Sequence, residues 1–465
     1  MKSQIAVPQN KKSYLKNSSL IILAFASVFF PRIIETAGAP SLINFVHFPL
    51  VILTTIIVLT TSQTKNRKQI AVAKTLISGL FVLLGVMIAS AMLNQAGIVN
   101  LLLDFLMLGE PFLLLLTIVY IPMSPTIIKR LKTWLIVFSL INLFSAFVQR
   151  FLLLTGAMQP PGNMTLEDAV QGVFFYSGAG NYVSATISVI VALYCFISFK
   201  TAPLLLRCAG LLLAFIQLII SDSKQVLIAL IVALIILAAI KSTELTKLLT
   251  YLLGTLIVLA ILFWCVQNLD SFSAFKNWTG RLELYGPNGE GTKVKLSALG
   301  IIASHYESLL NLFFGLGPGH TVSRLGGWII PEKWDLLSPL GATIHPASKE
   351  VWRTMYASWV ARESTMFSPL FGWAGIWGDL GLFGLGAYSY LGYVVWRYLC
   401  LDDVYKFLLL NVAVFGLIFS QMEEPGYMLS VAFIIGLGYQ ERLIHQAAKV
   451  KYLRSILKIQ EDSKI

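Results

Sequence analysis

Long apolar runs separated by short polar segments dominate the chain. We count about twelve such runs of roughly 17 to 25 residues, each long enough to cross a bilayer core of about 30 Å as a helix. They lie near residues 18–34, 40–61, 70–93, 97–121, 133–157, 180–199, 203–220, 224–240, 246–266, 369–396, 404–420 and 425–440. The pattern predicts an all-α polytopic membrane protein, with residues 1–465 forming a single integral membrane domain.

Two polar stretches interrupt this pattern, at residues 158–179 and 267–368. The second lies between the ninth and tenth spans, and its periodicity predicts one helix from about Val294 to Phe313 and another that begins at Pro346. We therefore expect one large loop that contains short helices.

Lysine and arginine are concentrated in alternate connections, at residues 11–16, 65–68, 129–132, 200, 241–247 and 397. Basic residues in short connections stay on the cytoplasmic side of a membrane. We therefore expect both termini to be cytoplasmic and the 267–368 loop to face outward. Residues 441–465 alternate apolar and basic side chains, which predicts a cytoplasmic, basic amphipathic tail on the anionic inner leaflet.

Composition agrees with a membrane protein, since 57% of the residues are hydrophobic and 12% are charged. The net charge of +12 suits a positive cytoplasmic face. Because no basic domain stands clear of the membrane, we expect no nucleic-acid partner. The four cysteines lack paired spacing and the five histidines lack metal-ligand spacing, so we expect no disulfide framework, no metal and no other cofactor.

A few ionisable residues lie inside apolar spans, where each costs about 2.5 to 3.5 kcal/mol and needs a partner or a wet cavity. They are Asp104, Glu110, Arg150 and Asp379. Asp104 and Arg150 lie at similar depths in consecutive spans. We therefore predict a structural ion pair between Asp104 and Arg150.

The stretch "FGLGPGHTVSRLGG", residues 314–327, places glycines, a histidine and an arginine within the predicted outer loop. Gly317 and Gly319 permit tight turns and close approach to a ligand. The stretch is then either a site that presents backbone amides, His320 and Arg324 to a substrate, or a flexible connector between two helices.

The helix predicted from Pro346 carries cations and aromatic rings at helical spacing. Lys349, Trp352, Arg353, Tyr356 and Trp359 recur at i, i+3, i+4 and i+7, which places them close to one face. Such a face is typical of a helix at the membrane interface, and it is equally suited to a saccharide site. Lys224, in the turn "SDSKQ", either extends to lipid phosphate or contacts an anion.

Several motifs, in order from about residue 219 to 396, resemble the O-antigen polymerase and O-antigen ligase superfamily of bacterial membrane glycosyltransferases. "IISDSKQVLIALIVALIIL" resembles its Ser-x-Ser-Arg/Lys turn, "TGRLELY" its Gly-Arg motif, "FGLGPG" its Gly-x-Gly-Pro-Gly motif, and "WGDLGLFGLGAYSYL" its glycine-rich span. The resemblance implies metal-independent, inverting transfer of glycan from undecaprenyl pyrophosphate to an acceptor hydroxyl. It places the chain in the bacterial inner membrane, with the large loop in the periplasm.

The resemblance also implies fixed cations for the leaving pyrophosphate and a base for the acceptor proton. Arg281 and Arg353, with His320 as the first choice of base and His345 or His305 as alternatives, are the catalytic candidates. The substrate-binding candidates are Lys224, Arg324, Lys349, Trp352, Tyr356, Arg362, Gly317 and Gly319.

One departure favours a polymerase over a ligase. Ligases carry a histidine-rich segment before the glycine-rich span, whereas this chain has "RESTMFSPLFGW" there. A chain-length regulator and a flippase are the protein partners that a polymerase implies. A transporter of lipid-linked sugar or of a small solute is the alternative class, although no internal repeat is visible.

Overall fold

Helices make up all the regular secondary structure in the part of the chain that the structure describes. The computed structural model describes residues 11–462 apart from 163, 176–178, 242–244 and 269–280. The long helices are α1 (Lys11–Ala26), α3 (His47–Thr61), α4 (Arg67–Leu93), α5 (Ile98–Tyr120), α6 (Pro125–Leu154), α7 (Gly180–Ser198), α8 (Leu204–Ile220), α9 (Lys224–Ile240), α10 (Leu245–Asn268), α18 (Gly372–Tyr398), α19 (Asp403–Ile418) and α20 (Pro425–Asp462).

Apolar helices with outward hydrocarbon faces indicate a membrane protein. Six helical segments among the described residues are long and apolar enough to cross a bilayer: Ser41–Thr61, Arg67–Leu93, Ile98–Tyr120, Pro125–Leu154, Gly180–Ser198 and Leu248–Asn268. Large apolar side chains are exposed on several helices, among them Phe81 on α4, Phe144 on α6 and Leu205 on α8. Water would not tolerate so much exposed hydrocarbon, so these faces need lipid.

The first apolar run is not one continuous helix. α1 ends at Ala26, and a second short helix, α2 (Pro31–Thr36), begins with Pro31 at its first turn. Proline has no backbone N–H, so it can start a helix but cannot continue one. At the other end of the chain, the predicted tail is not separate, because α20 continues from Pro425 to Asp462.

The predicted loop is rich in short helices. They are η3 (Leu282–Tyr285), α12 (Glu290–Ser304), α13 (Leu309–Phe314), η4 (Leu325–Ile329), α14 (Ile330–Glu332), α15 (Trp334–Leu337), η5 (Ser338–Leu340), α16 (Pro346–Ala357), α17 (Trp359–Glu363) and η6 (Thr365–Phe367). The helix predicted at 294–313 is divided in two, because Ser308 and Asn311 form a capping box that starts α13. The predicted start at Pro346 is confirmed.

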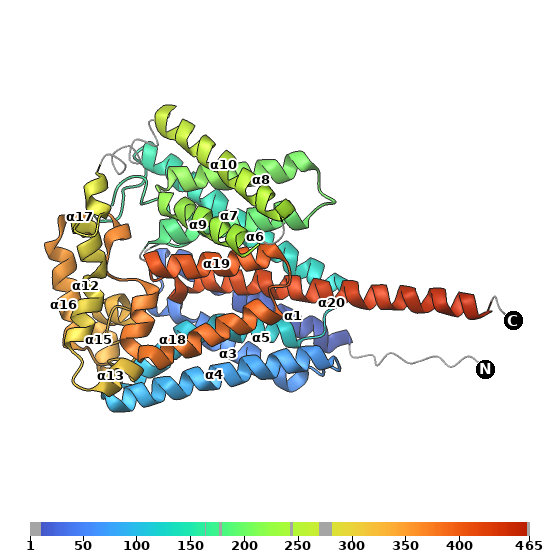
Figure 1. Cartoon of the computed structure of the whole chain (residues 1–465), viewed down its shortest axis with the longest axis horizontal. Helices are drawn as coiled ribbons and strands as arrows, with labels where there is room; N and C mark the ends of the chain where they lie inside the picture. The colour runs from blue at the N-terminus through green and yellow to red at the C-terminus, as the bar shows by residue number, and fades with distance from the viewer. Residues whose placement is uncertain (1–10, 163, 176–178, 242–244, 269–280, 463–465) are drawn as a thin grey trace.

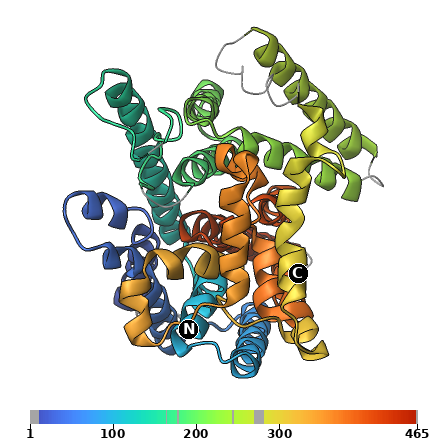
Figure 2. The same cartoon turned by 90° about the vertical axis from the view of Figure 1, so that its left-hand side faces the viewer.

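The long helices run side by side, and the loop helices gather at one end of them (Figure 1). α4 packs against α5 and α18, while α5 also packs against α3 and α20. The C-terminal part of α20 projects from the opposite end of the bundle, near the start of α1 (Figure 1). Seen from the loop end, the loop helices lie in front of the bundle (Figure 2).

A kink in α18 joins the bundle to the loop. Gly381 has a φ of +65° inside the helix, and a side chain there would collide with the backbone of Phe313. The kink leaves two α18 carbonyls free to accept from the loop, and the amides of Leu316 and Gly317 donate to Gly378 and Asp379 at 2.8 and 3.0 Å. The glycine-rich stretch is therefore fixed to α18 of the helix bundle.

Candidate functional site

A broad groove with aromatic walls lies along α16. We call it the aromatic groove; its volume is about 1050 Å³, and its lining includes Trp328, Lys349, Trp352, Arg353 and Tyr356. The ring of Trp352 stacks between those of Trp328 and Tyr356, with centroid distances of 6.4 and 5.1 Å. The structure thus brings together four of the five residues whose spacing predicts a shared face.

These groove residues present both flat rings and positive charge to solvent. Tyr356 is 61% exposed and Trp328 39% exposed, and the side chains of Lys349 and Arg353 are also exposed. Exposed aromatic rings beside cations are unfavourable for stability alone, because a folded chain gains more by burying them. The groove therefore has the character of a binding surface.

A second, smaller cavity lies beside this groove and is dominated by charge. We call it the charged cavity; its volume is about 100 Å³. Three cations line it, each from a different helix or connection: Arg32 of α2, Arg324 before η4, and Lys333 after α14. Trp328 and Glu332 line both the aromatic groove and the charged cavity, so the two spaces adjoin.

Four carboxyl groups also line the charged cavity, and each has a partner. Glu35 accepts from Asn44 and Glu332 pairs with Lys333, whereas Glu423 and Glu424 accept from the backbone amides of Arg324 and Tyr427. These partners fix the carboxyl groups and leave the shape of the cavity well defined.

Glu423 lies in η7 (Gln421–Glu423), which connects α19 to α20, and is 1% exposed. Burial, followed by the nearby charge of Asp379, raises the pKa of Glu423 to about 8. The carboxyl group is therefore mostly neutral at pH 7. Its Oε1 atom is buried and makes no hydrogen bond within the described residues.

The charged cavity also contains a histidine that the sequence does not single out. His47, at the start of α3, lies 2.8 Å from Glu110 of α5 through its Nδ1 atom. Both side chains are buried. Glu110 precedes Pro111 inside α5, and its carboxylate has this histidine as its partner.

His320, our first choice of base, has no free ring nitrogen. Its Nδ1 atom lies 2.8 Å from the carbonyl oxygen of Leu316, and its Nε2 atom lies 2.7 Å from the hydroxyl of Thr343. The side chain is 4% exposed, and burial lowers its pKa. The role of His320 as base therefore stays a prediction, and in this structure the ring is buried with both nitrogens bonded inside the loop.

The backbone amides of the glycine-rich stretch are also occupied. Asp379 accepts from the amides of Gly319 and Thr321 at 3.0 and 2.7 Å, and from the Thr321 hydroxyl. Gly317 and Gly319 both have positive φ, and neither lines the groove or the cavity. The stretch joins α13 to the segment that carries Arg324 to the charged cavity, and Gly317 and Gly319 lie outside both spaces.

His345 and His305 have structural partners of their own. Nδ1 of His345 accepts from the amide of Ala347 and so caps α16. Burial and the neighbouring rings of His320 and His305 lower the pKa of His345 to about 4. His305 pairs with Glu350 at 2.9 Å on an exposed surface. Neither ring lines the groove or the cavity.

Three other predicted cations lie outside the two spaces. The guanidinium of Arg281 stacks over the ring of Trp359 at 5.6 Å. Lys224 pairs with Asp222 in the turn before α9, and Arg362 is exposed on α17. The structure therefore does not bring Arg281, Lys224 or Arg362 together with Arg324 and Arg353.

The predicted ion pair between Asp104 and Arg150 is wrong. Arg150 pairs with Glu167 at 2.9 Å, whereas Asp104 is 1% exposed and neither of its carboxyl oxygens has a hydrogen-bond partner within the described residues. The prediction assumed that consecutive apolar runs pack together. In the structure, α5 packs against α3, α4 and α20, while α6 packs against α1, α7 and α20.

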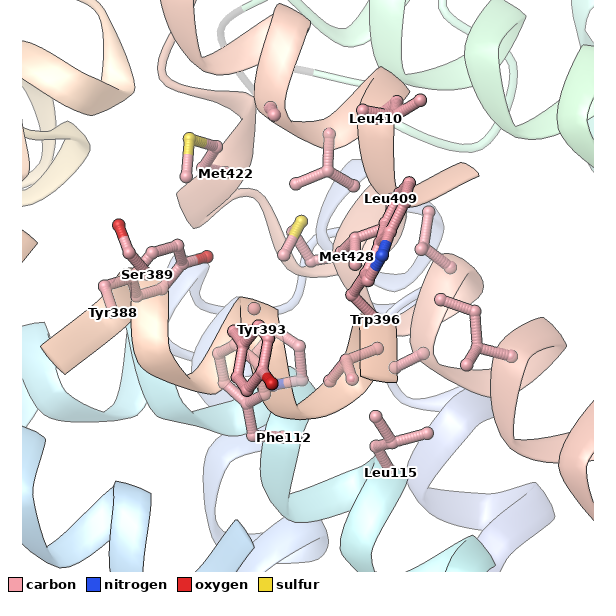
Figure 3. A pocket seen from close by; sticks show the side chains of 18 of the residues that line it. Phe112, Leu115, Tyr388, Ser389, Tyr393, Trp396, Leu409, Leu410, Met422 and Met428 are labelled. Atoms are coloured by element: carbon pink, nitrogen blue, oxygen red, sulfur yellow. The ribbon is translucent and has the colours of Figure 1, made fainter. Parts of the chain in front are cut away.

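An apolar cavity of about 300 Å³ lies between α5, α18, α19 and α20. Its lining is almost entirely hydrocarbon and aromatic, including Phe112, Tyr393, Trp396 and two methionines, Met422 and Met428 (Figure 3). Met422 directly precedes Glu423, which lines the charged cavity. One short connection thus borders an apolar space on one side and a charged space on the other.

Comparison with known proteins does not identify a family for this chain. No protein-family model matches the chain, and a search of curated proteins finds no significant match.

Proposed function

We propose that this protein is a membrane glycosyltransferase that polymerises or transfers undecaprenyl-pyrophosphate-linked oligosaccharides. It works at the periplasmic face of a bacterial inner membrane during surface polysaccharide synthesis. In this proposal the chain crosses the membrane about twelve times, counting the shorter apolar helices, with both termini in the cytoplasm. The reaction is inverting and independent of metal.

The observation that carries the proposal is the junction of the aromatic groove with the charged cavity at Trp328 and Glu332. A lipid-linked glycan has three chemically different parts: sugars, a pyrophosphate and a hydrocarbon tail. Flat rings and planar guanidinium groups suit sugars and phosphate oxygens respectively. Two spaces of those two characters, in contact with each other, match two adjoining parts of one substrate.

Arg32 and Arg324 face the same small cavity. The two positive charges repel each other, and an anion bound between them offsets this repulsion because it attracts both. A leaving pyrophosphate gains charge as its bond to the sugar breaks, so fixed cations at this place stabilise the transition state more than the ground state.

The apolar cavity suits the third part of the substrate. It lies among apolar helices, and its lining includes Met422, which directly precedes Glu423 of the charged cavity. A polyprenyl chain is apolar and flexible, and methionines adapt to such chains. The proposed donor would lie with its tail against α18 and α19, its pyrophosphate at Arg32 and Arg324, and its sugars along α16.

The test is turnover by the purified protein in nanodiscs. The substrate is undecaprenyl-pyrophosphate-linked oligosaccharide isolated from a strain that lacks this chain. A polymerase yields products of two or more repeat units and releases undecaprenyl pyrophosphate, both detectable by mass spectrometry. A ligase forms product only when an external acceptor is added. Transport of unaltered lipid-linked glycan or of a small solute, without a new glycosidic bond, would contradict the proposal.

A further inference from the structure

The charged cavity contains one imidazole that a buried carboxylate orients. Nδ1 of His47 lies 2.8 and 2.9 Å from the two oxygens of Glu110. A carboxylate can only accept a hydrogen bond, so in the tautomer that donates to Glu110 the proton is on Nδ1 and Nε2 keeps a lone pair. No hydrogen bond to Nε2 occurs within the described residues. His47 lines the cavity, so this lone pair is available to a bound ligand.

We propose that His47 is the proton acceptor of the transfer reaction and that Glu110 is its positioning residue. This inference rests on the proposed function. The hydroxyl oxygen of the acceptor sugar attacks the anomeric carbon of the donor and forms the new glycosidic bond. The bond from that carbon to the pyrophosphate oxygen breaks, and its electron pair leaves with the pyrophosphate. The hydroxyl proton passes to Nε2 of His47, which later releases it to water.

The partners of the other groups in the cavity leave His47 as the best acceptor. Arg32, Arg324 and Lys333 are cations and cannot accept a proton in their charged forms. Each of the four carboxyl groups has a bonded partner, and Glu423 is mostly protonated at pH 7. An imidazole whose other nitrogen donates to a carboxylate is held in the tautomer that a general base requires.

Glu110 also stabilises the positive charge that His47 gains when it accepts a proton. When Nε2 takes a proton, the ring becomes a cation within hydrogen-bond distance of a buried carboxylate. This arrangement stabilises the protonated ring without moving any group. The pair joins α3 to α5, two helices that pack against each other, so its geometry is fixed before the substrate binds.

The experiment compares five variants of the full chain in nanodiscs, with the lipid-linked oligosaccharide as donor. His47→Gln should lower turnover by roughly 100-fold or more, the usual scale for loss of a general base. Glu110→Gln should lower it by about 10-fold to 100-fold, because an amide can donate to Nδ1 and favour the wrong tautomer. His445→Gln, at an exposed histidine of α20 that lines neither space, is the matched control and should turn over normally.

Two further readouts separate catalysis from structure. Binding of undecaprenyl pyrophosphate should change less than about threefold in His47→Gln, since the cations that hold the anion remain. In the fourth variant, His47→Ala, added imidazole should restore part of the turnover, because it can fill the vacated space and accept the proton. Imidazole should not restore Arg324→Ala, in which the missing group is a cation.

Near-normal turnover of His47→Gln, with Arg324→Ala inactive, would overturn the role of His47 and leave the proposed function standing. Lost binding of undecaprenyl pyrophosphate by His47→Gln, or no response of His47→Ala to imidazole, would likewise overturn it and assign the pair to structure. Should His47→Gln fail to fold, normal turnover of Glu110→Gln would decide against the inference. Absence of transfer by the unaltered protein would overturn the proposed function and this inference together.

Discussion

The aromatic groove and the charged cavity adjoin, yet they are built in opposite ways. The groove is about 1050 Å³, open, and lined by side chains of α16 and of the preceding segment between Trp328 and Ile344. The cavity is about 100 Å³ and draws its charged side chains from α2, α3, the η4–α14 region and η7. A wide surface formed by two consecutive segments tolerates changes in what it binds, whereas a small cavity assembled from distant segments holds a few atoms in fixed positions.

The difference suggests a division of work within the proposed enzyme. Recognition of a long, variable glycan suits the groove, and bond breaking at the pyrophosphate suits the cavity. Changes to the cavity, or to what supports it, should therefore have larger effects than changes to the groove. The predictions below test that order.

The largest expected effect comes from removing Asp379, whose carboxylate holds the loop segment that leads to Arg324 in the charged cavity. Asp379→Ala removes one carboxylate that accepts three hydrogen bonds from the loop, from Gly319 and from the amide and hydroxyl of Thr321. Each buried donor left unpaired costs about 1 to 3 kcal/mol, so the free energy of unfolding should fall by at least about 3 kcal/mol. Thermal unfolding in detergent measures this change. Asp379→Asn, which keeps one acceptor oxygen, should lose less, and equal losses in both variants would contradict the role of the hydrogen bonds.

The second-largest expected effect is a loss of turnover when a cation of the charged cavity is removed. Arg324→Ala should lower turnover by about 100-fold, the scale for removing one group that stabilises developing negative charge. Arg324→Lys should recover only part of the rate, because lysine keeps the charge and loses the planar fork. Arg362→Ala, at an exposed arginine outside both spaces, is the control. Similar rates for Arg324→Ala and Arg362→Ala would remove the charged cavity from the mechanism.

The groove should respond more mildly. Trp352→Ala removes the central ring of a three-ring stack, a contribution of about 0.5 to 1.5 kcal/mol. This corresponds to a rise in KM of roughly 2-fold to 12-fold with little change in kcat. Trp352→Phe should restore most of the affinity for the donor. A loss confined to kcat would mean that the groove takes part in the chemistry, and the division between the two spaces would then fail.

The smallest effect is a dependence of stability on pH. The pKa of His345 is lowered to about 4 in the folded protein, from about 6.5 in an unfolded chain. The unfolded state therefore takes up protons first as the pH falls, and stability from this residue is lost between about pH 6.5 and 4. Protonation also removes the cap on Ala347. His345→Asn keeps a capping side chain without this titration, so its melting temperature should fall less between pH 7 and pH 5. Identical pH dependence in both proteins would contradict this origin.

Features carried by one continuous segment could be predicted from the sequence. The apolar runs, the start of α16 at Pro346 and the shared face of Lys349, Trp352, Arg353 and Tyr356 depend on local periodicity alone. Helical spacing places such residues together whatever the rest of the chain does. These are the predictions that the structure reproduces most closely.

Features that depend on which helices pack together could not be predicted in this way. Asp104 and Arg150 lie in consecutive apolar runs, which predicts that they pair. In the structure, however, α5 and α6 pack mainly against other helices, and Arg150 pairs with Glu167. His47 and Glu110 are 63 residues apart, and His47 lies within an apolar run without any motif. The sequence does contain one signal: His47 in the second apolar run and Glu110 in the fourth are polar side chains that each need a partner.

His320 shows a second limit of local reasoning. Its position after three glycines suggested a side chain delivered to a substrate, but the glycines serve to fit the loop against the kink of α18. The same glycine pattern serves a binding loop or a packed joint, and only the partners of the amides distinguish them. In this chain, those partners are Gly378 and Asp379.

The most direct test of the central claim is a cryo-EM structure of the full chain in nanodiscs with undecaprenyl-pyrophosphate-linked oligosaccharide. We expect density for the pyrophosphate between Arg32 and Arg324, with the first sugars leading past Trp328 toward Trp352. Density for the pyrophosphate outside the charged cavity, for example beside Lys224 or Arg281, would contradict the account.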